Sequence, residues 1–184
     1  IQDAYDSGDT AAPVARRLAD KKPENDGQFG LALRWYAESL GDTEFGFYHM
    51  NLHSRLPYIS GYVNDRDNGV LYPSYFIEYP EDIRFTGISF NRGTDSGWSI
   101  GGELSVKEDL PVQWNSFEIL LGGLQSDVSR LYTGKVEEYM AANGVDEDAA
   151  KAALSGTSFE GFDRYDVWQS QMTFIKFFDQ VMKA

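Results

Sequence analysis

Residues 98–107 read WSIGGELSVK, and this segment alternates between two kinds of residue. One parity carries Trp98, Ile100, Gly102, Leu104 and Val106, and the other carries Ser99, Gly101, Glu103, Ser105 and Lys107. Successive side chains of a strand point to opposite faces of its sheet, so this pattern predicts a strand with one apolar face and one polar face. A ten-residue strand of this kind is typical of the wall of an outer-membrane barrel.

Other segments carry the same pattern with different regularity. Residues 29–38 alternate cleanly, with Phe29, Leu31, Leu33, Trp35 and Ala37 opposed to Gly30, Ala32, Arg34, Tyr36 and Glu38. In residues 45–56 we expect Tyr48, Met50 and Leu52 on the apolar face, so Phe45 and Phe47 require a bulge or face the polar side. Residues 83–90 show a similar defect at Phe85, and a further strand is expected to begin near Val167.

The connections between these strands are alternately short and long. Turns rich in Gly, Asp and Asn occur at 40–43 and 91–97, whereas long connections follow residue 56 and residue 107. We therefore predict a mainly β fold of antiparallel up-and-down strands, a partial outer-membrane β-barrel with a helical insertion. The expected organisation is a loop segment over 1–28, four strands in two hairpins over 29–107 with a long loop at 57–82, a long loop over 108–165, and the start of a further strand over 166–184.

The long loop at 108–165 is expected to hold about two helices. Ser126 or Asp127 is the expected N-cap of a helix that stops near Asn143-Gly144, and Asp146 is the expected N-cap of a second helix ending at Leu154. Such a helical hairpin either caps the barrel mouth or gates it, with the apolar segment 119–124 near the entrance.

Composition excludes several classes of protein. The 16 Lys and Arg against 29 Asp and Glu give a net charge of −13, which opposes binding to nucleic acid. The absence of Cys excludes disulfides, thiolate metal sites and Cys nucleophiles. No apolar run approaches the roughly 20 residues of a membrane helix. Because the chain starts at Ile1 rather than Met, we expect a fragment or processed piece of a longer protein.

No residue pattern predicts catalysis, a cofactor or a metal. His49 and His53 share a strand parity, but four residues along a strand span about 13 Å, too far for two ligands of one zinc. The acidic segment 64–69 lacks the bidentate Glu of an EF-hand, because Phe76 stands at that position, so a surface turn is expected and divalent-ion binding is the weaker alternative. Nucleophile-elbow, Walker and dinucleotide motifs are absent from the sequence, so an enzyme is not expected.

The polar parity of the strands is predicted to line a barrel lumen. The candidate lumen residues are Arg34, Tyr36, Glu38, His49, Asn51, His53, Arg55, Glu103 and Lys107. Mixed charge of this density either filters solutes in a wide pore or forms a hydrogen-bonded plug in a narrow barrel. Trp35, Phe90 and Trp98 lie near the short turns on the apolar parity, where they form either an aromatic girdle or part of an ordinary core.

Several of these segments resemble a known family. Residues 75–84, YFIEYPEDIR, followed by GISFN at 87–91 and GELS at 102–105, resemble the proteobacterial outer-membrane domain-of-unknown-function family thirteen-oh-two. DGQFGLALR at 26–34, EFGFY at 44–48 and SRLPY at 54–58 are similar to the hairpin that precedes them in that family. The resemblance implies an internal segment of a longer porin-like channel of Gram-negative bacteria that passes small molecules, hydrophobic compounds among them. It supplies no catalytic residues.

Two functions are consistent with the sequence. The first is a segment of an outer-membrane channel or transporter, with membrane lipid and a small solute as partners and with further strands or further copies needed for closure. The second is a soluble or cell-surface binding module that recognises carbohydrate or protein through a tyrosine-rich loop. The candidate recognition residues are Tyr58, Tyr62, Tyr72, Tyr75 and Tyr79.

Overall fold

The computed structural model describes residues 15–65 and 72–178. The chain divides into two compact units, which are described separately. The helical unit comprises Ile1–Pro23, Arg55–Pro80 and Pro111–Asp163, and the sheet unit comprises Glu24–Ser54, Glu81–Leu110 and Arg164–Ala184. The acidic segment 64–69 lies largely outside the described residues.

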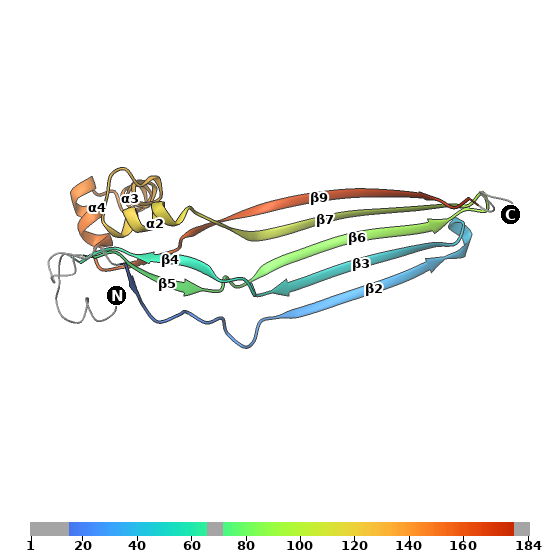
Figure 1. The fold of residues 1–184 in the computed structure, drawn as a ribbon, viewed down its shortest axis with the longest axis horizontal. Helices are drawn as coiled ribbons and strands as arrows, with labels where there is room; N and C mark the ends of the chain where they lie inside the picture. The colour runs from blue at the N-terminus through green and yellow to red at the C-terminus, as the bar shows by residue number, and fades with distance from the viewer. Residues whose placement is uncertain (1–14, 66–71, 179–184) are drawn as a thin grey trace, which may run out of the picture. The chain divides into compact units, whose positions relative to one another are not determined.

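The sheet unit is one five-stranded antiparallel sheet (Figure 1). Its strands, in spatial order, are β2 (Phe29–Ala37), β3 (Thr43–Leu52), β6 (Ile83–Gly93), β7 (Trp98–Gln113) and β9 (Phe162–Lys176). The order of these five strands across the sheet is the same as their order along the chain. The expected mainly β, antiparallel architecture is therefore confirmed.

Short turns join the strands at one end of the sheet. The turn between β2 and β3 contains a 3₁₀ helix, η1 (Glu38–Leu40), followed by Gly41 at φ 74° and Asp42 at φ 54°. The turn between β6 and β7 is closed by Thr94, whose carbonyl accepts from the Gly97 amide at 2.9 Å and whose hydroxyl accepts from the Trp98 amide at 3.1 Å. Left-handed backbone at Gly41, Asp42 and Gly97 explains why Gly and Asp occupy these turns.

The segment expected to be a long loop at 57–82 contains regular structure instead. It holds β4 (Tyr58–Tyr62) and β5 (Ser74–Glu78), which pair antiparallel with Tyr58 opposite Glu78. The two short strands β1 (Arg16–Arg17) and β8 (Ser158–Phe159) complete a second sheet in the order β1-β5-β4-β8. Strands of two to five residues carry too little alternation to be recognised in the sequence.

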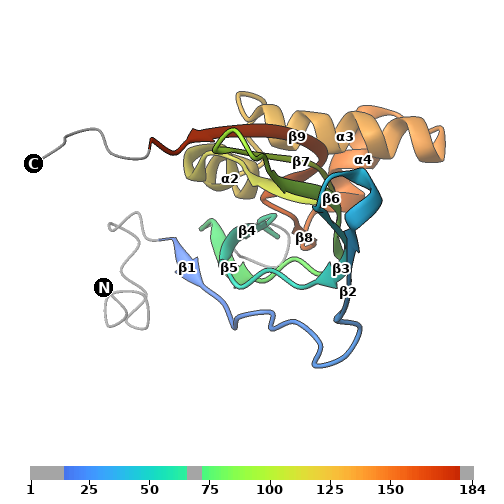
Figure 2. The same cartoon turned by 90° about the vertical axis from the view of Figure 1, so that its right-hand side faces the viewer.

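The segment 108–165 contains three helices rather than the expected two or so. These are α2 (Ser116–Gly123), α3 (Arg130–Asn143) and α4 (Glu147–Leu154), of which α3 and α4 lie side by side (Figure 2). Helix α3 is capped by Ser129, whose side chain accepts from the Tyr132 amide, so the expected caps at 126 and 127 are wrong by two or more residues. The helix ends at Gly144, whose backbone is left-handed, so the expected stop is confirmed. The expected N-cap at Asp146 is also confirmed.

A small apolar core holds the helical unit together. Val63, Tyr132, Val136 and Ala150 are buried, with Phe159 and Leu154 among the residues packed against them. Helix α3 therefore uses its Leu131, Tyr132 and Val136 face for packing, whereas Val128, which precedes the N-cap, is 76% exposed.

Candidate functional site

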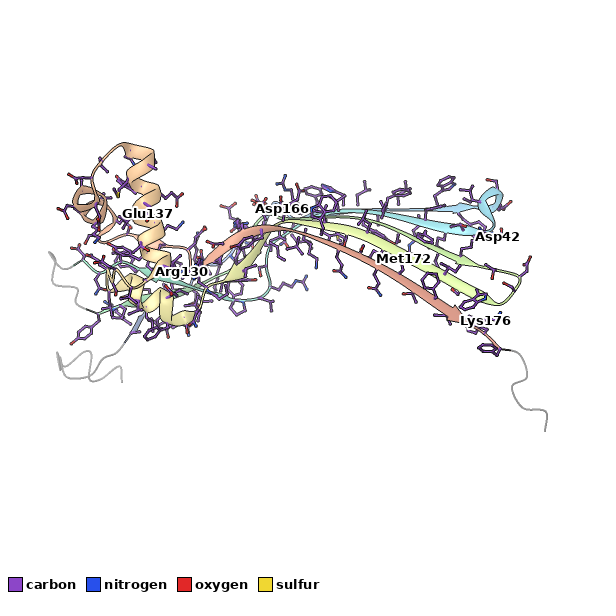
Figure 3. The ribbon with its side chains drawn as sticks, turned by 90° about the horizontal axis from the view of Figure 1, so that it is seen from above. Asp42, Arg130, Glu137, Asp166, Met172 and Lys176 are labelled. Atoms are coloured by element: carbon purple, nitrogen blue, oxygen red, sulfur yellow. The ribbon has the colours of Figure 1, made fainter. Side chains whose placement is uncertain are left out.

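The five-stranded sheet has one face on which apolar side chains predominate, here called the apolar face. It also carries Arg92 in the row beside the short turns, and Arg84 and Glu108 in a row at the opposite end. Cross-strand partners share a face of a sheet, so the strand register identifies its members. On β2, β3, β6 and β7 they are Phe29, Leu31, Leu33, Trp35, Phe45, Phe47, Ile88, Phe90, Ile100 and Leu104. Strand β9 contributes Met172, which lies against the position of Gly102, and by alternation Trp168 and Phe174. Figure 3 shows side chains projecting from both sides of the sheet, with Met172 on β9.

The apolar face is uncovered. Leu31, Leu33 and Trp168 are 69%, 60% and 70% exposed, and the remaining large side chains of strands β2 and β9 on this face are more than half exposed. Soluble proteins seldom leave a contiguous apolar patch larger than a few hundred Å² in water. A face of this kind requires an apolar environment or a partner.

Aromatic side chains gather on the apolar face near the short turns. Trp35 and Phe45 stack with ring centroids 5.5 Å apart, and Phe45 lies opposite Phe90. Phe90 in turn lies over Gly102, where an added Cβ would meet both its ring and the sulfur of Met172. At the turn itself, the Lys176 ammonium lies 5.4 Å from the Trp98 ring centroid. The structure thus brings the predicted Trp35, Phe90 and Trp98 to one face and one end of the sheet.

The opposite face, here called the polar face, collects four of the predicted lumen residues. Arg34, Gly46, Ser89 and Glu103 form one cross-strand row, and Tyr36 and Lys107 lie in other rows of the same face. Their positions follow from the regular alternation of β2 and β7, as expected.

His49 and Asn51 are not on the polar face, which corrects the sequence prediction. His49 lies opposite Leu31 and Asn51 opposite Phe29, so both belong to the apolar face together with Phe45 and Phe47. The register of β3 runs through without a bulge, and Tyr48, Met50 and Leu52 therefore take the polar face. Strand β3 carries apolar residues on both parities, so its own alternation could not decide between the faces.

His49, Asn51 and His53 instead form hydrogen bonds at the end of the sheet remote from the short turns. The His49 Nδ1 lies 2.9 Å from the Thr86 hydroxyl, and the Asn51 amide donates to the Gly27 carbonyl at 3.0 Å and to Asp82 Oδ1 at 2.8 Å. His53, which follows β3 and is 7% exposed, accepts from the Asp82 amide through Nδ1 and lies 2.7 Å from the Asp26 carbonyl through Nε2.

These partners fix the tautomer of His53. A backbone N–H can only donate and a carbonyl can only accept, so Nδ1 carries the lone pair and Nε2 carries the proton. The ring thereby joins three backbone segments, at residues 26, 53 and 82. His53 is a structural connector rather than part of an open wall.

Two arginines make a second set of contacts at the same end of the sheet. Arg84 Nη2 lies 2.9 Å from Asp109 Oδ2, and Arg164 donates to the Glu81 carbonyl at 2.9 Å. The Asp109 amide donates to Asp166, which is labelled in Figure 3, at 3.2 Å. These bonds join β6, β7 and β9 where the strands leave the sheet.

Of the remaining predicted lumen residues, Glu38 lies in η1 and Arg55 follows the end of β3. Both are exposed and neither belongs to a strand of the sheet. The candidate lumen set is therefore divided between the polar face, the apolar face and the ends of the sheet.

A hollow of about 330 Å³ lies on the polar face near the short turns. Its polar lining consists of Glu44, Ser89, Asn91, Ser99, Glu103, Gln171 and Thr173. Gly101 leaves open space in it, since an added Cβ there would have only the Phe90 carbonyl within 4 Å, at 3.6 Å. The sequence prediction does not include Glu44, because it puts the even residues of β3 on the apolar face. The structure places Glu44 opposite Tyr36, and the length of the turn after β2 was the signal available.

The five tyrosines of the proposed recognition loop do not share a face. Tyr58 and Tyr62 lie on one face of the β4–β5 pair, whereas Tyr75, opposite Gly61, lies on the other. Tyr58 donates its hydroxyl to the Pro111 carbonyl at 3.0 Å and packs edge-on against Phe162. All five, including Tyr72 and Tyr79, are half-buried. Tyr58 therefore has a packing role within the helical unit.

A buried carboxylate lies in the segment 75–84, one of those that resemble the family. Glu78 is 3% exposed, accepts a hydrogen bond from the Ser60 hydroxyl and lies 3.3 Å from the Lys21 ammonium. Ser60 Oγ also accepts from the Gly161 amide at 2.9 Å. This arrangement joins β4, β5 and the start of β9, and it explains Glu78 as a structural residue.

Within residues 15–65 and 72–178, no group of three or more His, Asp or Glu residues is arranged to hold a metal ion. No helix in the described part of the chain is long and apolar enough to cross a membrane.

A comparison with protein-family models matches residues 2–183 to the family described as "Protein of unknown function (DUF1302)". The family resemblance found in the sequence is thereby confirmed. Comparisons with curated proteins and with solved structures find no match.

Proposed function

The chain belongs to this family, and we propose on that premise that its sheet unit is a segment of the membrane-embedded wall of a bacterial outer-membrane β-barrel. The barrel would be a channel or transporter for small molecules, hydrophobic compounds among them, and not an enzyme. The observation that carries the proposal is that a single sheet layer has an uncovered, mainly apolar face on one side, whereas its other side carries the charged residues Arg34, Glu44, Glu103 and Lys107.

The energetics of the apolar face support a lipid environment. Burying apolar surface is favourable by about 25 cal/mol per Å², so uncovered side chains such as Leu31, Leu33 and Trp168 carry a substantial cost in water. Lipid tails remove that cost without a second protein layer. The polar face, with Arg34 and Glu103, suits water.

The dimensions of the sheet also agree with a membrane wall. Strands β2, β3 and β6 have 9, 10 and 11 residues, and a tilted membrane strand needs about 9–11. Strands β7 and β9, with 16 and 15 residues, are longer than this minimum. The aromatic cluster of Trp35, Phe45, Phe90 and Trp98 at the short turns matches an interfacial girdle. Short turns at one end and long connections at the other correspond to periplasmic and external sides.

Closure of the proposed barrel requires more strands. Within the described residues, β2 pairs only with β3, and the five-stranded sheet ends at β9 on its other side. Free sheet edges do not persist in hydrocarbon, because backbone groups there have no water to bond. Further strands of the protein or further copies of the chain would supply the missing pairs.

A cysteine pair tests which face meets lipid, since the chain has no native Cys. Leu33→Cys and Ala32→Cys place one label on each face at adjacent, exposed positions of β2. With an environment-sensitive fluorophore in vesicles of brominated lipid, we expect strong quenching at position 33 and weak quenching at 32. Equal, weak quenching at both positions in folded protein would overturn the membrane wall.

Planar-bilayer recording tests the channel. The native protein is expected to give discrete openings whose ion selectivity shifts in opposite directions for Arg34→Ala and Glu103→Ala. A monomer that stays soluble without detergent and gives no openings would contradict the proposal and favour the binding module.

A further inference from the structure

The hollow on the polar face brings together two carboxylates that come from different strands. Glu44 lies on β3 and Glu103 on β7, with Ser89 and Asn91 of the intervening β6 between them. Both carboxylates are exposed, and neither forms an ion pair within the described part of the chain. Both carboxylates therefore face solvent, and no basic group of the described residues lies within ion-pair distance of them.

Small residues keep the space between the two carboxylates open. Ser89 and Gly101 occupy positions in the same two rows as Glu103 and Glu44. Two strand spacings separate β3 from β7, which places the carboxylate-bearing backbones roughly 10 Å apart across the sheet. A hydrated ion can enter a space of this width without losing its water.

The basic residues of the polar face lie outside the hollow. Arg34 is on β2, opposite Gly46, and Lys107 is four residues further along β7 than Glu103, which is roughly 13 Å. Neither lines the hollow. Arg34 is a diagonal cross-strand neighbour of Glu44, at roughly 7–8 Å, and partly offsets its charge. The charged side chains that line the hollow itself are nevertheless Glu44 and Glu103, so its lining is net negative.

From this arrangement we infer that Glu44 and Glu103 make the polar face select cations over anions near the short turns. The inference rests on the proposed function, because it assigns these residues to the water-filled side of the channel wall. The permeating species it favours are small hydrated cations, including inorganic monovalent ions and ammonium compounds.

The first test is the reversal potential of the native protein in a planar bilayer under a KCl gradient. We expect K⁺ to be preferred over Cl⁻, with Glu44→Gln and Glu103→Gln each lowering the preference by about threefold, as for a screened charge at roughly 6 Å in water. Glu137→Gln, an exposed position on α3, removes the same charge from outside the sheet and should leave the ratio unchanged. If Glu44→Gln and Glu103→Gln both give openings with an unchanged K⁺ over Cl⁻ preference, the inference is overturned while the channel stands.

A second test does not depend on conduction. Ser89→Cys places a thiol on the floor of the hollow, and Gln169→Cys provides an exposed control position on β9 outside it. Relative to that control, a cationic methanethiosulfonate should modify the thiol at position 89 faster than an anionic one, and Glu44→Gln should reduce the difference. Modification at position 89 without charge preference would overturn the inference, whereas a charge preference without conductance would support it and contradict the channel.

Discussion

Trp35 and Phe45 lie directly opposite each other in neighbouring antiparallel strands, with ring centroids 5.5 Å apart and ring planes inclined by 26°. This pair fixes the face of β3. Because odd-numbered Trp35 is opposite odd-numbered Phe45, every odd residue of β3 shares the apolar face of β2. This one register explains the aromatic cluster, the position of His49 on the apolar face and the position of Glu44 on the polar face.

The stacked rings should be energetically coupled. Aromatic pairs in this geometry contribute about 0.5–1.5 kcal/mol beyond their buried area. A double-mutant cycle with Trp35→Leu and Phe45→Leu, measured by denaturant unfolding of the protein in lipid vesicles, should return a coupling of that size. Coupling close to zero would mean that the two rings do not touch in the membrane-inserted protein.

Leu33 should tolerate charge poorly. It is the central residue of the nine-residue β2 and lies on the apolar face, so the proposed membrane places it near the bilayer midplane. Leu33→Arg is expected to cost about 2–4 kcal/mol in unfolding free energy from vesicles. Ala32→Arg, one residue away on the polar face, is the matched control, and a cost equal to that of Leu33→Arg would contradict the face assignment.

Two adjacent glycines on β7 should respond differently to the same substitution. A Cβ at Gly102 would overlap the Phe90 ring and the Met172 sulfur, whereas a Cβ at Gly101 meets only a carbonyl oxygen at 3.6 Å. Gly102→Ala should therefore destabilise the sheet by about 1–3 kcal/mol. Gly101→Ala should be near neutral in the same unfolding assay, and equal effects at the two positions would be evidence against the Phe90 packing.

The alternation of β2 and β7 was enough to predict their faces, and the Gly- and Asp-rich turns marked where the hairpins close. Strand β3 could not be assigned in this way, because it carries Phe45 and Phe47 on one parity and Tyr48 and Met50 on the other. Its face depends on the length of the turn that follows β2, where Ala37 lies opposite Thr43.

The helical unit was harder to predict for a related reason. Strands β4 and β5 are five residues long, too short for a periodic signal. Their other partners, β1 and β8, come from segments far apart in the chain. Helix α2 contains Gly122 and Gly123, which lower helix propensity and conceal it. The formation of β4, β5 and α2 therefore depends on tertiary packing rather than on a local sequence signal.

Ser60 should be a sensitive position within the helical unit. It is fully buried, donates to the Glu78 carboxylate and accepts from the Gly161 amide. Ser60→Ala leaves both groups without this partner, and losing a buried bond to a charged group costs roughly 1.5–3 kcal/mol. Ser158→Ala, at an exposed position of β8, should cost little, and a comparable loss there would show that the burial of Ser60 is not responsible.

Lys151 should confer a pH-dependent stability with a defined sign. Its ammonium lies 2.7 Å from both Asp127 and Glu147. The hydrogen bond to Asp127, and to a smaller extent the one to Glu147, raises the pKa of Lys151 above its ordinary value. A raised folded-state pKa means that the stabilisation is complete below the unfolded value, about 10.4, and is lost as the pH rises from there through the folded value. Thermal unfolding followed by circular dichroism should therefore show a constant difference between wild type and Lys151→Met from pH 6 to 9. The difference should shrink above pH 10, and a difference that grew with alkalinity would contradict the ion-pair assignment.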